Sequence, residues 1–520
     1  MARDYPNTPE TAKLGPKLDV AGLVFAAYAL LLAACSGDGG DVDSPPPVYF
    51  RVDVSLTGAG TASPKTQQVQ QGTTASISLL ADSGQRIGAA SGCGGTLNNA
   101  TYTTAPIYSN CTVKVEFIAD TVVFDCSGAN CSEILLFHDP AATMPGGMPS
   151  PFRGYADASV RKDPTTGEFW MAYSWPHLNS YFDVGSQQYY QVAGVDIHLA
   201  HSFNGGANGS WQSGIAGNAL WAAHPATDLG ASGVSGYTDY EVANLLPVKN
   251  ADNSVTWYGV RLAYFVTPKD NPLGGKFDCF TPDGCERPND SFRLEISRAD
   301  SPPELANAES AVLGGAITSA NWGVNTNLAA LPEADSSNLD KCMWWNEPAL
   351  YHEGATLYLV ARCMAFAGPL PDLSEFDLMV FATEPEGKAV GEWAWRHVGR
   401  LTDAQDASAL GGEGLTQADI MIGSQGQLLM IVTPDSWNSG FVHHNCQAVE
   451  LESIDPPIIK RDRGEIRVWS LITASDQSGL GNGSCTYEAA SSAGIVMAKR
   501  VFDDPQAALV SALYQTGIMP

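Results

Sequence analysis

Short stretches in which apolar and polar residues alternate begin at about residue 49. Tyr49–Leu56, Thr73–Leu80 and Cys111–Phe117 alternate as strands do, and Gly58-Ala59-Gly60 follows the first of them as a turn. Three such strands close together predict a small β-module over residues 49–119. Its sequence contains no motif that indicates catalysis.

A different pattern recurs five times after this module: a carboxylate, a short run of small or apolar residues, a turn, and then an apolar strand. The five segments are Tyr155–Val160, Tyr240–Leu245, Asn346–Tyr351, Ala418–Ile422 and Tyr487–Ser492. Their lead carboxylates lie between 69 and 106 residues apart along the chain. Self-similarity at such spacing indicates a repeat architecture. We therefore predict that each segment is the innermost strand of a propeller blade.

Further strands follow the first four segments, as expected for blades of four strands each. Tryptophans mark the predicted fourth strands, at Trp211, Trp393, Trp395 and Trp469. In the shorter fifth unit, Ile495–Ala498 is expected to be the third strand and Ala512–Tyr514 the fourth, with the second missing. Glu133–Phe137 is expected to return and close the ring. The predicted fold is all-β: a small β-sandwich-like module followed by a five-bladed β-propeller over residues 120–520.

Composition and charge narrow the range of functions. The chain of 520 residues has 52 glycines and 32 prolines, and only 16% of its residues are charged, which is typical of a turn-rich β protein. Its formal net charge is −28, so it repels nucleic acids and anionic membrane surfaces. A nucleic-acid partner is therefore not expected.

The N-terminus has the features of an export signal. Val20 to Ala34 is an apolar stretch too short for an ordinary membrane span, and it runs into Leu32-Ala33-Ala34-Cys35, which resembles a bacterial lipobox. The resemblance implies a lipoprotein signal segment over residues 1–35, in which Cys35 becomes the lipidated first residue after cleavage. Ser36 after it implies sorting to the outer membrane. The alternative is a plain secretory signal with an incidental cysteine. Residues 36–48 read as a linker, and we expect a cell-envelope protein facing the periplasm or the outside.

Ten cysteines follow Cys35, an even number that favours disulfides in an exported protein. We expect each cysteine to pair with its neighbour in sequence, because each bond then closes a short loop. Cys93–Cys111 would join two strands of the module, whose sequence resembles β-repeat modules of bacterial surface proteins. The spacing does not match a zinc-thiolate site.

If the five segments surround one axis, their carboxylates converge on it. A ring of like charges is costly, because each charge disfavours ionisation of the others, so we infer a functional reason for it. The candidate catalytic residues are Asp157, Glu241, Glu347 and Asp419, and Glu488 leads the fifth segment. Two structural alternatives stay open: such carboxylates can hold a structural cation such as calcium, or bond to the neighbouring strand.

Two of these segments resemble blades of five-bladed glycoside hydrolases of the family 43 type. Asp157-Ala158-Ser159-Val160 resembles the blade that carries the general base, and Glu347-Pro348-Ala349-Leu350 resembles the blade that carries the general acid. The resemblance implies Asp157 as base, Glu347 as acid, and a middle acidic residue that tunes the pKa of the acid. Glu241 fills that position, where the family usually has Asp, and Asp239 is the alternative.

Glycoside hydrolysis with inversion needs one carboxylate that activates water and one carboxylic acid about 6.5–9.5 Å away. Strands from non-adjacent blades can supply this separation, and mutual repulsion raises at least one pKa. Aromatic residues near the same strands could stack on sugar rings, namely Tyr155, Trp175, Tyr240, Trp344, Trp345 and Trp437. We expect a glycan ligand, no required cofactor and a monomeric protein.

Two other functions compete with this interpretation. Ser202-Phe203-Asn204-Gly205-Gly206 resembles a degenerate sialidase Asp-box, and a sialidase would need arginines such as Arg153, Arg161, Arg261 or Arg362 to hold the substrate carboxylate. The second is a non-catalytic propeller that binds carbohydrate or protein. Geometry separates them: an enzyme places Asp157 and Glu347 across an open funnel lined by aromatic residues.

Overall fold

The computed structural model describes residues 46–520 except 83–84, 120, 137–151, 208, 214–218, 228–233, 279–284, 287–291, 315–323, 368–369, 438–441, 463, 476–480 and 501–508. The predicted signal segment, Cys35 and most of the linker lie outside the described residues. No helix in the described ranges is long and apolar enough to cross a membrane.

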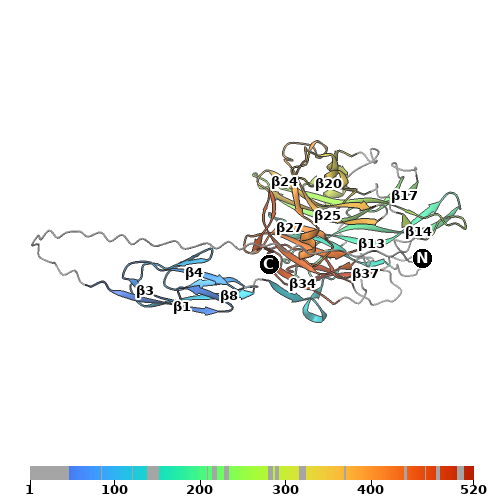
Figure 1. Ribbon diagram of the computed structural model, residues 1–520. Coiled ribbons are helices and arrows are strands. Elements are labelled where there is room, and N and C mark those ends of the chain that lie inside the picture. The colour runs from blue at the N-terminus through green and yellow to red at the C-terminus, as the bar shows by residue number, and fades with distance from the viewer. Residues whose placement is uncertain are drawn as a thin grey trace, which may run out of the picture.

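The N-terminal module is a sandwich of two four-stranded sheets (Figure 1). One sheet has the order β3-β1-β8-β5, with bounds Thr66–Gln70, Tyr49–Thr57, Cys111–Ala119 and Gln85–Ser91. The other has the order β2-β4-β7-β6, with bounds Gly60–Ser63, Ser76–Ala81, Thr101–Thr103 and Thr96–Asn98. Alternate residues of the facing strands, such as Val52, Ile77 and Val113, are fully buried between the sheets. The module touches the second domain through Arg86, which lies 4.6 Å from the Trp469 ring.

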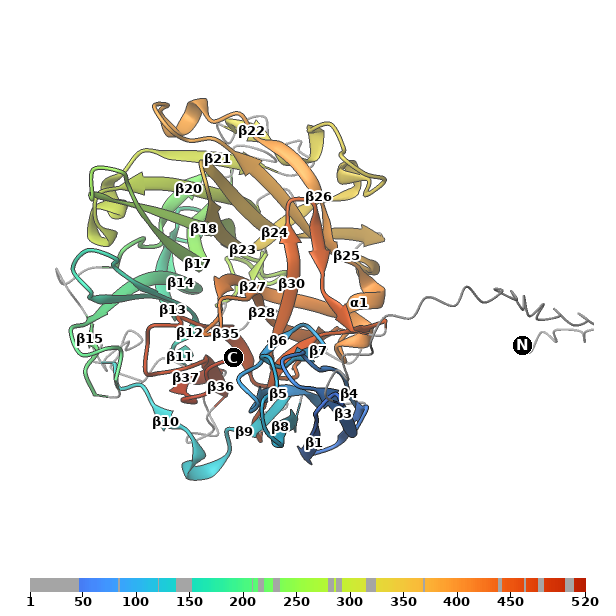
Figure 2. The same ribbon diagram turned by 90° about the vertical axis from the view of Figure 1, so that its left-hand side faces the viewer.

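Five further sheets surround a common axis, as a propeller does (Figure 2). Their innermost strands are β12 (Ala156–Lys162), β17 (Ser235–Lys249), β23 (Trp344–Glu353), β27 (Gly414–Ile422) and β35 (Gly483–Thr486). Each is followed outward by antiparallel strands, and the faces of adjacent sheets pack through buried apolar residues. The predicted all-β fold, a small sandwich followed by a propeller, is confirmed.

The outer strands complete each blade. The first blade adds β13 (Phe169–Asp183), β14 (Gln188–Ser202) and β15 (Gln212–Ser213). The second adds β18 (Val255–Pro268), β20 (Arg293–Ala299) and β21 (Ser310–Gly314), with the short β16 (His224–Thr227), β19 (Cys285–Glu286) and β22 (Thr326–Asn327). The third adds β24 (Thr356–Ala367), β25 (Leu370–Thr383) and β26 (Arg396–Thr402). The fourth adds β28 (Leu428–Ser436), β30 (Cys446–Ile454) and β34 (Val468–Thr473), with the short β29 (Val442–His443) and β31 (Pro457–Ile459).

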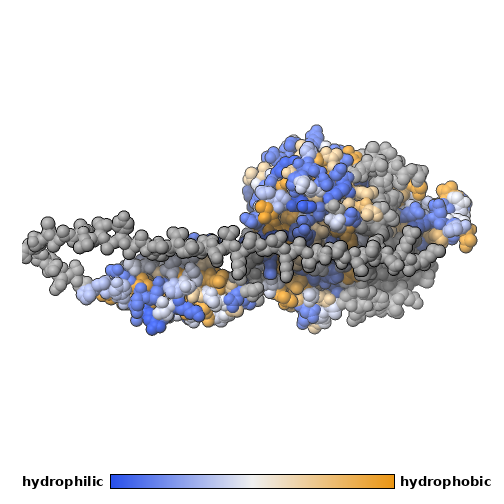
Figure 3. All heavy atoms as spheres, in the orientation of Figure 1, coloured by the Kyte–Doolittle hydropathy of each residue, from blue (hydrophilic) through white to orange (hydrophobic). Residues whose placement is uncertain are grey.

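Short connections complete the described chain. The hairpin β32 (Arg461–Asp462) and β33 (Glu465–Ile466) precedes β34, and the helix α1 (Ala404–Ala409) precedes β27. Short 3₁₀ helices span Gly128–Asn130, Pro302–Asn307, Leu328–Ala330, Leu339–Lys341 and Val390–Glu392. Figure 3 shows hydrophilic residues over much of the described surface of both domains, in keeping with the net charge of −28.

Segments from the start of the propeller domain complete its last two blades. In the fourth blade, β9 (Val122–Asp125) lies beside β34 as a parallel outer strand. In the fifth, β35, β36 (Val496–Arg500) and β37 (Leu509–Gln515) are followed by β10 (Ser132–Glu133), and β11 (Phe152–Gly154) also pairs with β37. The predicted return of the segment at Glu133 is confirmed, since Glu133 pairs with Tyr514. The prediction of a missing second strand is wrong: the segments expected as third and fourth strands form the second and third.

Neighbouring cysteines form disulfides, as predicted. The described bonds are Cys93–Cys111, Cys126–Cys131, Cys342–Cys363 and Cys446–Cys485. Cys285 is also disulfide-bonded, and its expected partner Cys279 lies outside the described residues.

Every inner strand contains a β-bulge, and the position of this bulge aligns the five repeats with one another. The register shifts between Ala156 and Ser159 in β12, and the other four inner strands shift in the same way. At each shift one residue that is not glycine has a positive φ; these residues are Asp157, Val242, Glu347, Gln417 and Ser484, with φ between 48° and 61°. Such a backbone costs about 1–3 kcal/mol per residue and is typical of functional sites. The bulges show that Asp419 and Glu488 are not equivalent to Asp157 and Glu347.

At four of the five junctions, the residue two positions after the bulge joins its blade to the next. Its side-chain oxygen accepts a hydrogen bond from a backbone N–H in, or directly after, the following inner strand. The bonds are Leu245 N to Ser159 Oγ (3.0 Å), Leu350 N to Asn244 Oδ1 (3.0 Å), Tyr487 N to Asp419 Oδ2 (3.4 Å) and Val160 N to Thr486 Oγ1 (3.2 Å). At the remaining junction the equivalent residue is Ala349, whose side chain has no oxygen. We refer to these four bonds as the inter-blade ring.

An ion pair lies inside this ring. Arg161 and Asp419 are both almost fully buried, and both guanidinium Nη atoms donate to the carboxylate, with Nη1 at 3.1 Å from Oδ2. Asp419 also accepts hydrogen bonds from Asn244 Nδ2 at 3.0 Å and Thr486 Oγ1 at 2.7 Å. One carboxylate therefore links the first, second, fourth and fifth blades.

Replacing Arg161 by Met should destabilise the protein by about 3–5 kcal/mol, because it leaves Asp419 charged, buried and unpaired. Chemical denaturation at neutral pH measures this loss. The double variant Arg161→Met/Asp419→Asn keeps the oxygen acceptor but removes both charges, and it should recover most of the lost stability. A double variant no more stable than the single one would contradict this account.

Candidate active site

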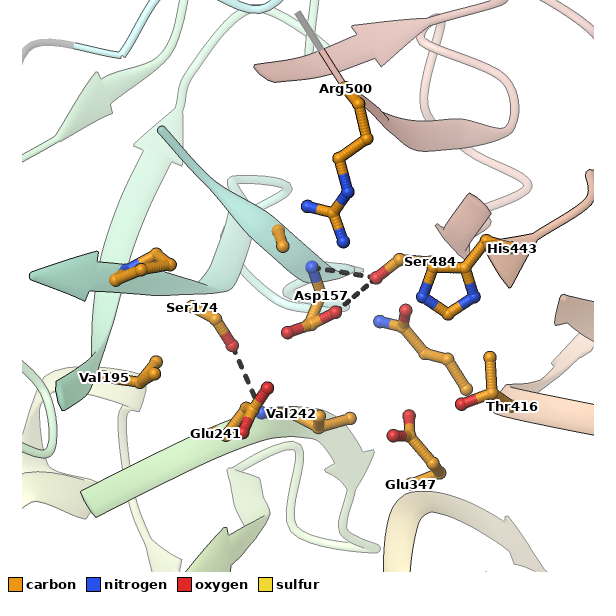
Figure 4. A pocket seen from close by; sticks show the side chains of 13 residues that line it. Asp157, Ser174, Val195, Glu241, Val242, Glu347, Thr416, His443, Ser484 and Arg500 are labelled. Carbon is orange, nitrogen blue, oxygen red and sulfur yellow. Dashed lines mark hydrogen bonds between the residues drawn. The ribbon is translucent and has the colours of Figure 1, made fainter. Parts of the chain in front are cut away.

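A cavity opens at the end of the propeller axis where the five bulges lie. Its volume is about 100 Å³, smaller than the roughly 300–1,000 Å³ of sites for drug-sized molecules. Figure 4 shows Asp157, Glu241 and Glu347, from three different inner strands, with their carboxylates turned toward one space. The remaining lining residues are Ala156, Ser174, Pro176, Val195, Val242, Thr416, Gln417, His443, Ser484 and Arg500.

The hydroxyl of Ser484 fixes Asp157. Ser484 Oγ accepts a hydrogen bond from the Asp157 backbone N–H at 3.0 Å and donates one to Asp157 Oδ1 (Figure 4). One side chain thus stabilises both the strained backbone and the carboxylate orientation. Both residues occupy bulge positions, so the fifth blade positions the carboxylate of the first.

The second blade brings Glu241, and not Asp239, to the cavity. The backbone N–H of Val242 donates to Ser174 Oγ at 3.2 Å, which holds the bulge after Glu241. Asp239 is fully buried and is not part of the cavity lining. Between these two alternatives, the geometry favours Glu241 as the middle carboxylate.

Glu347 is the carboxyl group most changed by its surroundings. Its side chain is only 13% exposed, and burial raises its pKa to about 8, helped by the negative charges of Asp157 and Glu241. The Arg362 guanidinium opposes this rise in pKa, with Nη2 3.9 Å from Glu347 Oε1. At neutral pH Glu347 therefore holds a proton inside a cavity that contains two other carboxyl groups.

The other two predicted carboxylates lie elsewhere. Asp419 is outside the cavity lining, and its oxygens are held by Arg161 and the inter-blade ring. Glu488 follows the end of β35 and accepts backbone hydrogen bonds from Lys162 at 3.1 Å and Ala490 at 3.0 Å. Both positions favour the structural alternative for these residues.

The cavity lining contains none of the six predicted substrate-binding aromatic residues. Trp345 is fully buried against Phe381, and Trp344 stacks on Phe292. Tyr240 lies beneath the Arg261 guanidinium, and Trp437 lies 5.7 Å from that of Arg362.

The remaining two aromatic residues pack against side chains of β13. Tyr155 packs edge-on against Tyr173, and Trp175 stacks on His177. Each of the six therefore has a packing partner, and the funnel lined by aromatic residues that we expected of an enzyme is not seen among the described residues.

The cavity residues missed by the sequence analysis include Gln417, His443, Ser484 and Arg500. Gln417 and Ser484 occupy bulge positions, so aligning the segments on the inter-blade ring would have found them. His443 is buried, and burial together with nearby Arg500 and Arg362 lowers its pKa well below the usual value, so it is neutral at neutral pH. His443 and Arg500 lie outside the inner strands, and no spacing in the sequence indicated them.

The arginines proposed for a sialidase are mostly held elsewhere. Arg161 pairs with Asp419, Arg261 with Glu295, and Arg362 with Asp435. None of these three lines the cavity, where the arginine is Arg500. The sequence segment at Gly205 forms a turn after β14, with Gly205 and Gly206 at positive φ. Within the described ranges, no group of three His, Cys, Asp or Glu side chains is placed to hold a metal ion.

Known proteins offer limited comparison. No protein-family model matches the chain, and no curated protein matches it. Among solved structures, a family 117 glycoside hydrolase, Zg3597, from the marine bacterium Zobellia galactanivorans is similar with a TM-score of 0.39 and 9% identity, over 74% of this chain and 88% of that one. A Cellvibrio cellulosa α-L-arabinanase complexed with arabinohexaose is similar with a TM-score of 0.27 and 8% identity, over 58% of this chain and 76% of that one. Trypanosoma rangeli sialidase in complex with the inhibitor DANA is similar with a TM-score of 0.30 and 10% identity, over 74% of this chain and 59% of that one.

The proton held by Glu347 should make stability depend on pH. A carboxyl group whose pKa is raised on folding contributes stability below its unfolded pKa, and this contribution is lost as pH rises through about 8. Relative to the wild type, Glu347→Gln should therefore gain stability between pH 5 and pH 9, with an upper limit of about 5 kcal/mol. Denaturant titrations across this range measure the difference.

The matched control is Glu353→Gln, an exposed carboxylate at the other end of the same strand. It should follow the wild type at every pH. Parallel pH curves for wild type and Glu347→Gln would show that Glu347 is ionised like an ordinary surface carboxylate.

Proposed function

We propose that this protein hydrolyses glycosidic bonds in the cavity at the end of the propeller axis. One observation carries the proposal: a carboxyl group that is protonated at neutral pH, Glu347, shares a small cavity with a second carboxylate, Asp157, which is held by Ser484. A pair of carboxyl groups in opposite protonation states is the requirement for general acid catalysis of this reaction.

The geometry suggests a role for each group. Glu347 donates its proton to the glycosidic oxygen as the bond to the anomeric carbon breaks, which makes the leaving group a neutral alcohol. Asp157 acts on the opposite side of the sugar, either by removing a proton from the attacking water or by attacking the anomeric carbon itself. Glu241 keeps the Glu347 proton in place by its negative charge. The residues that act are protein side chains, and the proposal needs no cofactor.

The substrate is proposed to be a glycan whose terminal sugar enters the cavity. Three carboxyl groups in the lining disfavour a strongly anionic sugar at the reacting position, since like charges repel within a few ångströms. Hydroxyl, amide and imidazole groups of Ser174, Gln417 and His443 are the hydrogen-bonding groups that a neutral sugar needs.

We also propose that the chain is anchored to the outer membrane through Cys35, with the cavity facing away from the anchor. The lipobox-like sequence at Cys35 supports the anchor, and the direction of the strands supports the orientation of the cavity. The module is joined to β9, which runs parallel to β34 and enters the fourth blade at the end opposite Gln417. In Figure 1 the module accordingly projects from one side of the propeller, and the long β13–β14 hairpin from the other.

Hydrolysis across a panel of aryl-glycosides and polysaccharides tests the proposed function. Glu347→Gln should lower kcat by about 10²–10⁴-fold on natural glycans, and by much less on aryl-glycosides whose leaving group needs no proton. Asp157→Asn should abolish turnover of both kinds of substrate. Glu353→Gln, the exposed control on the same strand, should behave as the wild type.

The panel also separates the competing functions. If the wild type cleaves no glycoside but is retained on a glycan array, the protein is a carbohydrate-binding propeller and the enzymatic proposal fails. Cleavage that survives in both Asp157→Asn and Glu347→Gln would place the active site elsewhere.

A further inference from the structure

Asp435 is a buried carboxylate that the proposed reaction does not use. It lies near the end of β28, is 0% exposed, and its Oδ2 accepts a hydrogen bond from Arg362 Nη1 at 2.8 Å. Its other oxygen, Oδ1, is buried and has no hydrogen-bond partner among the described residues. A buried ion pair with an unsatisfied oxygen is a poor source of stability, because desolvation costs at least as much as the pairing gains. This arrangement indicates that Asp435 has a functional role.

Its partner Arg362 is held rigidly beside the proposed acid. Arg362 Nε donates to Asn346 Oδ1 at 3.1 Å, and the guanidinium lies 5.6 Å from the Phe376 ring and 5.7 Å from that of Trp437. With the side chain only 2% exposed, Nη2 is fixed 3.9 Å from Glu347 Oε1. The guanidinium therefore bridges the two carboxyl groups, Asp435 on one side and Glu347 on the other.

This bridge poses an electrostatic problem for the reaction. A permanent positive charge within about 4 Å of a carboxyl group favours its ionised form by one to three pH units. Glu347 would then have lost its proton at the pH where it must donate one. A negative charge on the far side of the guanidinium cancels much of this effect at Glu347.

We propose that Asp435 is a positioning residue for the active site: by pairing with Arg362 it cancels the guanidinium charge, so that Glu347 keeps the proton it donates. The inference rests on the proposed function only for the use of that proton. Arg362 provides a rigid side chain beside Glu347. Asp435 cancels the effect that the positive charge of Arg362 would otherwise have on Glu347.

Other charged groups also face Glu347 and are included in the design of the test. Asp157 and Glu241 approach from β12 and β17, and Arg500 from β36. His443, which pairs with Asp435 in the sheet, is neutral at neutral pH because its pKa is lowered. The buried Arg161–Asp419 pair lies on the inner strands outside the cavity lining. All of these groups are unchanged in the variants below.

Two single variants should move the titration of Glu347 in opposite directions. Asp435→Asn leaves Arg362 uncompensated, so the pH at which Glu347 loses its proton should fall by about one unit or more. Arg362→Met leaves Asp435 as an added negative neighbour, so this pH should rise. The double variant Arg362→Met/Asp435→Leu removes both charges and should return it close to the wild-type value. A purely structural role would not produce opposite shifts that cancel.

Infrared difference spectroscopy gives a readout that needs no substrate. The absorbance of the protonated Glu347 carboxyl is isolated by subtracting the spectrum of Glu347→Gln in each background, and it is followed from pH 4 to pH 10. If the enzyme is active, the alkaline limb of its kcat/KM profile should shift together with the infrared midpoint. One pH unit above the Asp435→Asn midpoint, kcat/KM of this variant should be about tenfold lower than its value on the plateau.

The outcomes separate this inference from the proposed function. A protein that cleaves nothing but shows the opposite shifts would overturn the hydrolase proposal and keep the electrostatic role of Asp435. An active enzyme whose infrared midpoint is the same in all variants would keep the hydrolase proposal and overturn the electrostatic role of Asp435. Asp435→Glu keeps the charge, so it controls for folding of the site and should keep the wild-type midpoint. If it shifts as Asp435→Asn does, the role of Asp435 is not its charge and the inference fails.

Discussion

The inter-blade ring is the interaction on which the rest of the structure depends. Inner strands of adjacent blades splay apart, so their backbones do not form a ladder with each other. Their register is fixed instead by single side-chain oxygens, each two residues after a bulge, that accept one backbone N–H from the next strand. The bulge and the bond form a unit, because the bulge turns the oxygen-bearing residue toward the neighbouring blade. The same bulge projects its own side chain into the cavity, which is how Asp157 and Glu347 come to face each other.

Two buried ion pairs accompany the carboxyl groups that line the cavity. Arg161 neutralises Asp419 within the ring, and Arg362 is held by Asp435 beside the cavity. All four residues of these pairs are almost fully buried. The carboxyl groups that a ligand can reach are those that line the cavity.

The sequence showed the architecture better than the details of the site. Alternation, the five-fold repeat and the cysteine order predicted the sandwich, the propeller and four disulfides, because these features depend on local pattern. Asp157, Glu241 and Glu347, which the sequence pattern grouped together, line one cavity. Asp419, which was grouped with them, does not line it, since a carboxylate two residues after a bulge looks in sequence like one at the bulge itself. His443 and Arg500 reach the cavity from second strands and loops, and only the three-dimensional path of the chain brings them there.

Closure of the propeller by β9 and β10 has a consequence for how the protein is made. These strands lie near the start of the domain, yet their partners β34 and β37 are among the last segments of the chain. A chain that emerges N-terminus first would expose both strands, with unpaired backbone groups, until almost the whole sequence is available. Ring closure is then a late and long-range event, which is slow in proteins whose contacts are distant in sequence. Shielding of these strand edges until the last blade arrives should therefore favour correct folding of this protein.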